Sequence, residues 1–221
     1  MKILAEIFSQ GEEVVTGQTL DTNATWLAQQ LTDIGFKVKR HTTVGDHLHD
    51  LANIFTEISI RADLCICTGG LGPTCDDLTA EALALASGFD LLFDADALVS
   101  IESYFAQRNR VMPETNRKQA YLPRGSVRID NPVGTAPGFR VKLGKCVFVC
   151  LPGVPTEMKS MYVQSVLPLL PQLFDLKPER LISLRTVGIG ESAIQQRLKS
   201  MQLPDDVELG FRAASGEVQV K

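Results

Sequence analysis

The sequence has no stretch that approaches the ~20 apolar residues of a membrane-spanning helix. Its first residues, "MKILAEIF", place Glu6 inside a run that a signal peptide keeps apolar. We therefore expect a cytoplasmic protein that has no membrane partner.

A basic excess is also missing, because 22 Lys and Arg residues stand against 26 Asp and Glu residues and the formal net charge is -4. A protein that binds nucleic acid through phosphates needs clusters of Lys and Arg to neutralise them. The composition therefore argues against nucleic acid as a partner.

Cysteine and histidine are few and unpatterned. The five cysteines form no CxxC pair, and the three histidines do not have the spacing of a known metal motif. We expect buried or incidental thiols in a reducing compartment, in preference to a zinc site or a disulfide framework.

Short apolar runs that alternate with helical patterns are abundant. Strands are predicted over 2–8, 36–42 and 63–68. Between them, apolar residues recur at helical spacing from Ala24 to Ile34 and from Leu48 to Ile58. This order predicts a parallel α/β sheet with right-handed crossovers.

The rest of the chain continues this pattern and then changes. Three further helices are predicted over 80–87, 95–108 and 156–170. One more core strand is predicted over 146–151. The composition shifts at 171–179, which we interpret as a linker. The predicted domains are therefore an α/β domain, 1–170, and a small α+β domain, 180–221.

Four conspicuous loops follow the carboxyl ends of the predicted core strands. They are "SQGEEVVTG" after the first strand, Asp46 after the second, "GGLGPTCDD" after the third and "LPGVPTEM" after the last. Ligands of an open parallel sheet bind at this edge, so the loops predict a binding site there.

The glycine loop, residues 69–77, has the composition of an anion-binding turn. Gly69, Gly70 and Gly72 allow backbone N–H groups to approach an anion, and a helix N-terminus follows. The loop matches neither GxxxxGK[ST] nor GxGxxG. The alternative is a tight turn in which Asp77 or Thr79 caps the next helix.

Acidic residues crowd the same predicted edge, namely Glu12, Glu13, Asp46, Asp76 and Asp77. Unpaired carboxylates would repel an anionic ligand. Mg²⁺ or a similar divalent ion removes this conflict, because it is held by carboxylates while phosphate oxygens complete its shell. We therefore expect a divalent metal beside a phosphate-bearing ligand.

Two further segments leave alternatives open. "RIDNPVGTAPGF" has more turn residues than a hairpin needs, and it is either an ordered connection or a loop that contacts the substrate. Residues 116–119 place positive charge near an anion or lie on a solvated helix face.

Six motifs in order carry a family resemblance: "GEEVVTGQTLDTNATWLAQQL", "TVGD", "GGLGPTCDDLTAEAL", "NRKQAYLP", "NPVGTAPGF" and "LPGVPTEM". Together they resemble the amino-terminal part of the CinA (competence/damage-inducible) family. The resemblance covers residues 1 to about 170, and "VGIGESAIQQRL" extends it into a KH-like domain. It implies a three-layer, mostly parallel α/β sheet of the molybdopterin-binding type, with a small KH-like appendage.

The resemblance also implies a function. CinA proteins are associated with metal-dependent ADP-ribose pyrophosphatase activity, which gives AMP and ribose 5-phosphate, whereas cofactor enzymes of this fold adenylylate molybdopterin. We therefore expect hydrolysis of a nucleoside diphosphate sugar, most simply ADP-ribose. The resemblance also favours a homo-oligomer, most simply a dimer.

This chain departs from the family patterns at two places. The cofactor enzymes usually have Gly-Gly-Thr-Gly where Leu71 stands third here, which favours the CinA branch. The usual Gly-Asp-Glu opening has Glu12 in place of Asp, so the carboxylate is one methylene further out. The nicotinamide-nucleotide amidohydrolase domain of many members has no counterpart in these residues, so we do not expect deamidation from them.

The resulting hypothesis gives each residue a role. Asp46, Asp77 and Glu12 are expected to act in catalysis, and Asp76 with Asp77 to hold the metal. The residues expected to bind phosphate and nucleotide come from the loops: Gly69, Gly70, Gly72, Pro73, Thr74, Asn131, Gly134, Thr135, Pro152 and Gly153. Two alternatives stay open: a module that binds molybdopterin or a nucleotide without catalysis, and molybdopterin adenylyl transfer.

Overall fold

A computed structural model of the chain describes residues 2–178, 182–204, 207, 209–214 and 216–220. The chain divides into two compact units, Met1–Pro178 and Glu179–Lys221.

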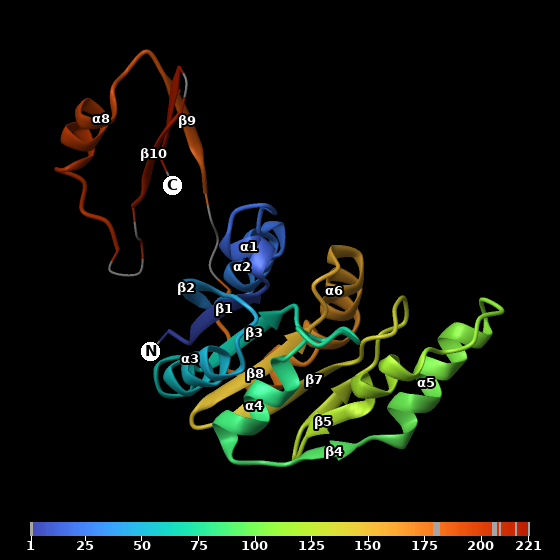
Figure 1. Ribbon diagram of the computed structural model, residues 1–221. Coiled ribbons are helices and arrows are strands. Elements are labelled where there is room, and N and C mark those ends of the chain that lie inside the picture. The colour runs from blue at the N-terminus through green and yellow to red at the C-terminus, as the bar shows by residue number, and fades with distance from the viewer. Residues whose placement is uncertain (1, 179–181, 205–206, 208, 215, 221) are drawn as a thin grey trace. The chain divides into compact units, whose positions relative to one another are not determined.

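A six-stranded sheet forms the centre of the first unit (Figure 1). Its strands, in spatial order, are β2 (Lys37–Val44), β1 (Leu4–Gln10), β3 (Leu64–Thr68), β8 (Cys146–Leu151), β7 (Gly138–Leu143) and β6 (Val127–Ile129). The pairs β1–β2, β1–β3 and β3–β8 are parallel, whereas β7 runs antiparallel to both β8 and β6. The prediction of a mostly parallel α/β sheet is confirmed.

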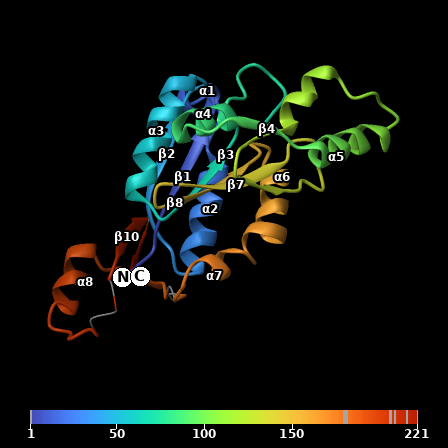
Figure 2. The ribbon, with the colours of Figure 1, turned by 90° about the horizontal axis from the view of Figure 1, so that it is seen from below.

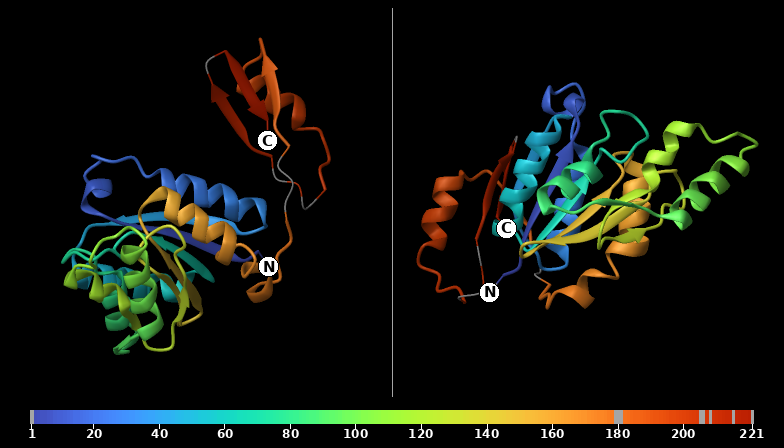
Figure 3. Two further views of the ribbon diagram at one scale, coloured as in Figure 1. Left: turned by 90° about the vertical axis from the view of Figure 1, so that its right-hand side faces the viewer. Right: turned by 60° about the horizontal axis from the view of Figure 1, so that its bottom comes forward.

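Helices cover both faces of this sheet (Figures 2 and 3). One face carries α2 (Thr22–Asp33), α6 (Pro155–Met161) and α7 (Leu170–Leu173), and the other carries α3 (Leu48–Arg61) and α4 (Thr79–Ser87). Neighbouring residues of a strand point to opposite faces. Ile7 of β1 accordingly packs in the α2 core, whereas Phe8 packs in the α3 core. The predicted three-layer architecture is therefore confirmed.

Helix α2 shows how the local sequence fixes an element. Asp21 caps it, because its Oδ1 accepts a hydrogen bond from the Ala24 amide at 2.8 Å. Ala24, Leu27 and Leu31 lie on one face of the helix and are buried. The predicted apolar stripe is therefore present, and Asp21 supplies the cap.

A smaller substructure lies between α4 and β6 in the sequence. It contains α5 (Ala95–Ala106), a 3₁₀ helix η1 (Glu114–Ala120) and a two-stranded sheet of β4 (Leu91–Phe93) and β5 (Tyr121–Pro123). A separate small apolar cluster holds α5 against η1 through Ala97, Ile101 and Ala120.

The segment after β8 differs from the prediction. One helix was expected over 156–170, but α6 passes into a π-helical stretch, η2 (Tyr162–Val166), before α7. Pro168 has no amide hydrogen to continue the helix, and α7 begins with Pro171 in its first turn. The linker expected over 171–179 thus contains part of α7, and the Phe174 ring packs against Phe36 with centroids 5.3 Å apart.

The second unit contains β9 (Leu184–Val187), α8 (Glu191–Leu198), β10 (Phe211–Ala214) and β11 (Glu217–Val220). The strands pair antiparallel in the order β10-β11-β9. Ile194 of α8 packs against Val218 and Val220 of β11. The KH-like assignment of this unit stays a prediction. Within the part of the chain that the structure describes, no helix is long and apolar enough to cross a membrane.

Candidate functional site

The side chain of Gln10 joins three loops at the carboxyl edge of the sheet. This last residue of β1 is only 5% exposed. Its Nε2 donates to Oδ1 of Asp46 at 2.8 Å and to the carbonyl of Asp76 at 2.9 Å. Its Oε1 accepts from the Thr79 hydroxyl at 2.5 Å. The loops that follow β1, β2 and β3 are therefore fixed relative to one another.

The glycine loop begins in a conformation that only glycine adopts easily. Gly69 and Gly70 have φ of 95° and 67°. A Cβ atom at Gly70 would overlap Oε1 of Gln10 and the hydroxyl of Thr79. The close approach of Gln10 to the loop therefore depends on the missing side chain.

Three successive backbone N–H groups follow in this loop without a partner. The Gly69 amide donates to the carbonyl of Leu151 at 3.1 Å. The amides of Gly70, Leu71 and Gly72 have no hydrogen-bond acceptor among the described residues. Consecutive free N–H groups of this kind form a concave site for an anion.

The loop after β8 lies beside the glycine loop. A Cβ atom at Gly153 would lie 3.4 Å from Cα of Gly69, which is van der Waals contact. Asn23 at the start of α2 donates from Nδ2 to the carbonyl of Gly153 at 2.7 Å. The structure therefore brings the loop of Pro152 and Gly153 next to that of Gly69, as the sequence predicted.

The carboxylate of Asp77 bends back onto its own loop. It accepts hydrogen bonds from the backbone amide of Thr74 at 2.9 Å and from the Thr74 hydroxyl. Helix α4 has Leu78 as its N-cap and no side-chain cap. Capping by Asp77 or Thr79, the expected alternative, is therefore wrong, because both side chains bond elsewhere.

The other expected acidic residues are also held by local contacts. Asp46 accepts from the backbone amide of Glu12 at 3.1 Å through Oδ2, in addition to its bond with Gln10. The Glu12 carboxylate lies against Gly45, where a Cβ atom would overlap Oε2. Asp76 is exposed, and its side-chain hydrogen bond with Thr74 lowers the pKa of Asp76 below its ordinary value of 3.8.

The expected metal-binding cluster is not formed. Among the described residues, no three His, Cys, Asp or Glu side chains lie close enough together to hold a metal ion. Asp77 turns toward Thr74, and Asp46 turns toward Gln10 and the Glu12 amide. Local hydrogen bonds thus hold the carboxylates of Asp77 and Asp46, and the divalent metal stays a prediction.

Lys118 of η1 supplies a cation to the glycine loop. Its Nζ donates to the carbonyls of Thr74 at 3.0 Å and Asp77 at 2.5 Å, and pairs with Glu81 at 3.2 Å. The neighbouring Gln119 donates to the carbonyl of Leu71 at 3.0 Å. Of the two interpretations of residues 116–119, positive charge near the loop is the one that the geometry supports.

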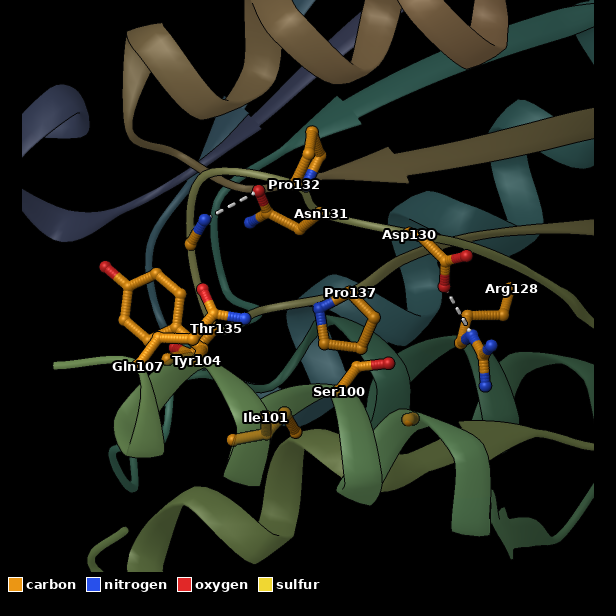
Figure 4. Close-up of a pocket in the computed structure, with 12 residues that line it drawn as sticks. Ser100, Ile101, Tyr104, Gln107, Arg128, Asp130, Asn131, Pro132, Thr135 and Pro137 are labelled. Atoms are coloured by element: carbon orange, nitrogen blue, oxygen red, sulfur yellow. Dashed lines mark hydrogen bonds and ion pairs between the residues drawn. The ribbon is translucent and has the colours of Figure 1, made fainter. Parts of the chain in front are cut away.

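A cavity of about 190 Å³ lies between α5 and the loop of residues 131–137 (Figure 4). Twelve residues line it: Ala97, Ser100, Ile101, Tyr104, Gln107, Arg128, Asp130, Asn131, Pro132, Gly134, Thr135 and Pro137. A smaller hollow of about 20 Å³ lies beside Gly70, Gly72 and Lys118, and Pro137 lines both spaces.

Asn131 shapes the loop at this cavity. Its Oδ1 accepts from the amides of Val133 at 3.1 Å and Gly134 at 2.9 Å. Its Nδ2 donates to the carbonyl of Ala136 at 2.9 Å and to Oε2 of Glu157 at 2.6 Å. The side-chain amide of Asn131 is therefore fully hydrogen-bonded within the protein and holds the loop in shape.

Sequence reasoning did not single out Gln10 or Glu157. Gln10 is a polar residue at the carboxyl end of a buried strand, and that position was the available signal. Glu157 lies within "LPGVPTEM", but nothing in that motif indicates its bond to Asn131, 26 residues earlier in the chain.

The sheet topology and this edge define an α/β domain of the molybdopterin-binding type. Residues 6–172 match the family described as "Probable molybdopterin binding domain". The chain belongs to the CinA family, and residues 6–172 are its molybdopterin-binding-like domain. Both the family and the fold predicted from the sequence are confirmed.

Relatives and solved structures agree with this assignment. A CinA-like protein of Shewanella sp. (strain ANA-3) is 42% identical over 217 residues, which cover 98% of this chain and 51% of the relative. A Shewanella oneidensis protein with the same identity and coverage is named nicotinamide-nucleotide amidohydrolase PncC. The chain therefore spans about half the length of the curated relatives it matches.

Among solved structures, a CinA protein of unknown function from Thermoplasma acidophilum is 35% identical, with a TM-score of 0.70 over 78% of this chain and 99% of that chain. The molybdopterin biosynthesis enzyme MoaB of Thermus thermophilus is 18% identical, with a TM-score of 0.51 over 77% of this chain and 92% of that chain. The second likeness concerns the fold alone.

The prediction of ADP-ribose pyrophosphatase activity is wrong on these comparisons. The relative whose name states an activity is a nicotinamide-nucleotide amidohydrolase. The predicted metal-dependent pyrophosphatase class of enzyme is therefore wrong as well. No cluster of three metal-binding side chains is formed among the described residues.

Proposed function

We propose that residues 6–172 are a nucleotide-binding domain in which the glycine loop binds a phosphate group. The observation that carries the proposal is the run of free amides at Gly70, Leu71 and Gly72. A phosphate accepts several N–H hydrogen bonds at once, and such charge-assisted bonds are about twice as strong as neutral ones. No phosphate-binding lysine of the GxxxxGK[ST] type is needed for this geometry.

Two side chains hold these amides in place before a ligand arrives. Gln10 fixes the loop through the carbonyl of Asp76 and the hydroxyl of Thr79. Lys118 fixes it through the carbonyls of Thr74 and Asp77 and brings a positive charge. A preorganised site loses less conformational entropy on binding, which favours affinity.

The carboxylate of Asp77 lies against Gly72, where a Cβ atom would overlap both of its oxygens, and its repulsion of a phosphate is offset in part by its own hydrogen bonds and by Lys118. It is bonded to the backbone amide and hydroxyl of Thr74, so hydrogen-bond donors already surround it. Lys118 bonds to the carbonyl of the same residue and places a compensating charge nearby. The loop therefore keeps its acids engaged while its free amides stay available.

The proposed class of ligand is based on the Shewanella oneidensis relative, whose name refers to a nicotinamide nucleotide. We propose a mononucleotide for this chain on that basis. The proposal concerns binding: the described residues of the site are assigned no bond-breaking step.

Isothermal titration calorimetry of the chain with AMP, nicotinamide mononucleotide and inorganic phosphate tests the proposal. Gly70→Ala puts a methyl group against Gln10 and disturbs the loop, so the affinity for the nucleotides should fall by about tenfold or more. Gly88→Ala is the matched control, because Gly88 has the same φ of 67° at the end of α4 and no atom near its Cβ position.

In both variants a side chain at a positive φ costs about 1–2 kcal/mol of stability. Only Gly70→Ala also disturbs the glycine loop. Fluorescence of Trp26, the single tryptophan, reports whether each variant is folded. Absence of binding of either nucleotide to the wild-type chain contradicts the proposal, as does an equal loss of affinity in both variants.

A further inference from the structure

We propose that the cavity between α5 and residues 131–137 binds the heterocyclic base of the nucleotide. This inference rests on the proposed function, since it assigns the second half of the same ligand. The cavity measures about 190 Å³. A cavity of about 150 Å³ holds benzene, and pockets for whole drug-sized ligands measure about 300–1,000 Å³. The space therefore fits one ring system and not an entire nucleotide.

The charges at the cavity argue against a phosphate in it. Arg128 is the cation of its lining, and Nη1 pairs with Asp94 at 2.7 Å while Nε pairs with Asp130 at 2.7 Å. Both sides of the guanidinium are thus neutralised by carboxylates that the chain itself supplies, and Figure 4 shows the pair with Asp130. An anionic group would compete with two carboxylates, whereas a neutral group avoids the conflict.

Two polar side chains of the cavity are available to form hydrogen bonds with the edge of a base. The side chains of Gln107 and Thr135 face this cavity from α5 and from the loop, and neither has a hydrogen-bond partner among the described residues. An amide offers donors and an acceptor, and a hydroxyl offers one donor and two acceptor sites. Heterocyclic bases present donors and acceptors in alternation, so these two side chains match them.

Flat and apolar groups form the remaining walls. Ile101 and Pro137 present hydrocarbon surface, and the ring of Tyr104 is held in place by Arg108, whose guanidinium carbon lies 3.5 Å from the ring centroid. Apolar walls with a few placed polar groups are the usual composition of a small-molecule site.

The cavity also shares a wall with the hollow beside the glycine loop, where the phosphate of the same nucleotide is proposed to bind. Pro137 lines both this cavity and the hollow beside Gly70 and Gly72. A phosphate on the free amides of the glycine loop and a base in the cavity are then neighbours. Pro137 is thus a wall shared by the two spaces, and in the proposed complex one mononucleotide spans them.

The test fills the cavity from an exposed position. Ser100 of α5 lines it, and its hydroxyl bonds only to the carbonyl of Asp96, one turn earlier. Ser100→Trp should occupy the space and weaken binding of adenosine by about tenfold or more, with binding of ribose 5-phosphate unchanged. Ser103→Trp is the matched control, because Ser103 is exposed on the same helix and does not line the cavity.

A second variant probes the hydrogen bond without changing the shape of the loop. Thr135→Val keeps the size of the side chain and should weaken adenosine binding several-fold. Adenosine that fails to bind the wild-type chain, or that binds the Ser100→Trp and Ser103→Trp variants equally, overturns the base site. Ribose 5-phosphate that fails to bind any of the proteins overturns the phosphate site instead, so the two proposals fail separately.

Discussion

The side chain of Gln10 donates a hydrogen bond to the carboxylate of Asp46, 2.8 Å away and 36 residues later in the sequence. The same nitrogen also donates to the carbonyl of Asp76. One buried amide at the end of the central strand β1 thus orients an acid after β2 and the loop after β3. Gln10 therefore contributes to the site by holding Asp46 and the glycine loop in position.

Replacing Gln10 by methionine should destabilise the first unit and weaken nucleotide binding. The variant keeps the volume of the side chain but removes its hydrogen bonds with Asp46, the carbonyl of Asp76 and the Thr79 hydroxyl, which costs about 1–3 kcal/mol. Urea unfolding followed by Trp26 fluorescence measures the free energy of unfolding, and calorimetry with AMP measures the affinity.

Gln164→Met is the control for this prediction. Gln164 is exposed on η2 and bonds only to the hydroxyl of Ser160. The control should change neither quantity. Equal stability and affinity of Gln10→Met and the wild-type chain would show that the bridge has no role in holding the loops.

The buried ion pair beneath the sheet edge yields a second prediction. Glu6 lies on the central strand with its side chain 3% exposed, and Arg61 binds it with both Nε, at 2.8 Å, and Nη2, at 3.0 Å. Arg61→Met leaves a buried carboxylate uncompensated, which costs about 3–5 kcal/mol. Urea unfolding at neutral pH measures this loss.

An exposed pair supplies the comparison for Arg61. Arg124 contacts Asp90 at 2.6 Å, but the two side chains are 58% and 74% exposed. Arg124→Met should therefore cost about 0–1 kcal/mol. The double variant Glu6→Leu with Arg61→Met should regain much of the loss, because it removes both charges. Similar losses for Arg61→Met and Arg124→Met would refute the role of burial.

The thiols should differ sharply in reactivity. Cys75 of the glycine loop is exposed, and the other four cysteines are buried. Burial raises the pKa of the thiols of Cys65, Cys67 and Cys146 above the ordinary value of 9.0, and the thiolate is the reactive form.

Titration with a disulfide reagent such as DTNB near pH 8 should therefore detect one thiol in the native chain and five in urea. Cys75→Ser should abolish the native reaction and leave four thiols in urea. Rapid reaction of two or more thiols in the native wild-type chain would contradict the burial of the sheet cysteines.

The sequence predicted those features that depend on neighbouring residues. Asp21 and the stripe from Ala24 to Leu31 lie within one helix, so the cap and the buried face were both readable. The apolar run of β3 was readable for the same reason, since all five of its residues are buried. The convergence of the loops followed from the topology of a parallel sheet.

The details of the site depend on distant residues and could not be read in this way. Gln10 meets Thr79 across 69 residues, and Lys118 reaches the carbonyl of Thr74 across 44. A carboxylate with a nearby hydroxyl, such as Asp77 with Thr74, satisfies itself locally. These local hydrogen bonds orient the carboxylates in a way that the order of residues in the sequence does not indicate.

Removal of the buried hydroxyl group of Tyr162 should not destabilise the protein. The residue is fully buried on η2, its ring packs edge-on against Trp26 at 5.3 Å, and its hydroxyl has no hydrogen-bond partner in the described structure. A buried polar group without a partner carries a desolvation cost. Tyr162→Phe should therefore leave the free energy of unfolding unchanged or raise it by about 1–2 kcal/mol near neutral pH.

The same residue should make stability depend on alkaline pH. Burial, with a smaller effect of the Asp33 charge, raises the pKa of Tyr162 above its ordinary value of 10.0. Above that pH the unfolded chain releases the phenolic proton while the folded chain retains it, so the free energy of unfolding falls as the pH rises. The Tyr162→Phe variant lacks this contribution and should lose less stability between about pH 10 and pH 11. Urea unfolding followed by circular dichroism measures the difference, with the exposed Tyr121→Phe as the control, and parallel pH profiles for all three proteins would contradict the prediction.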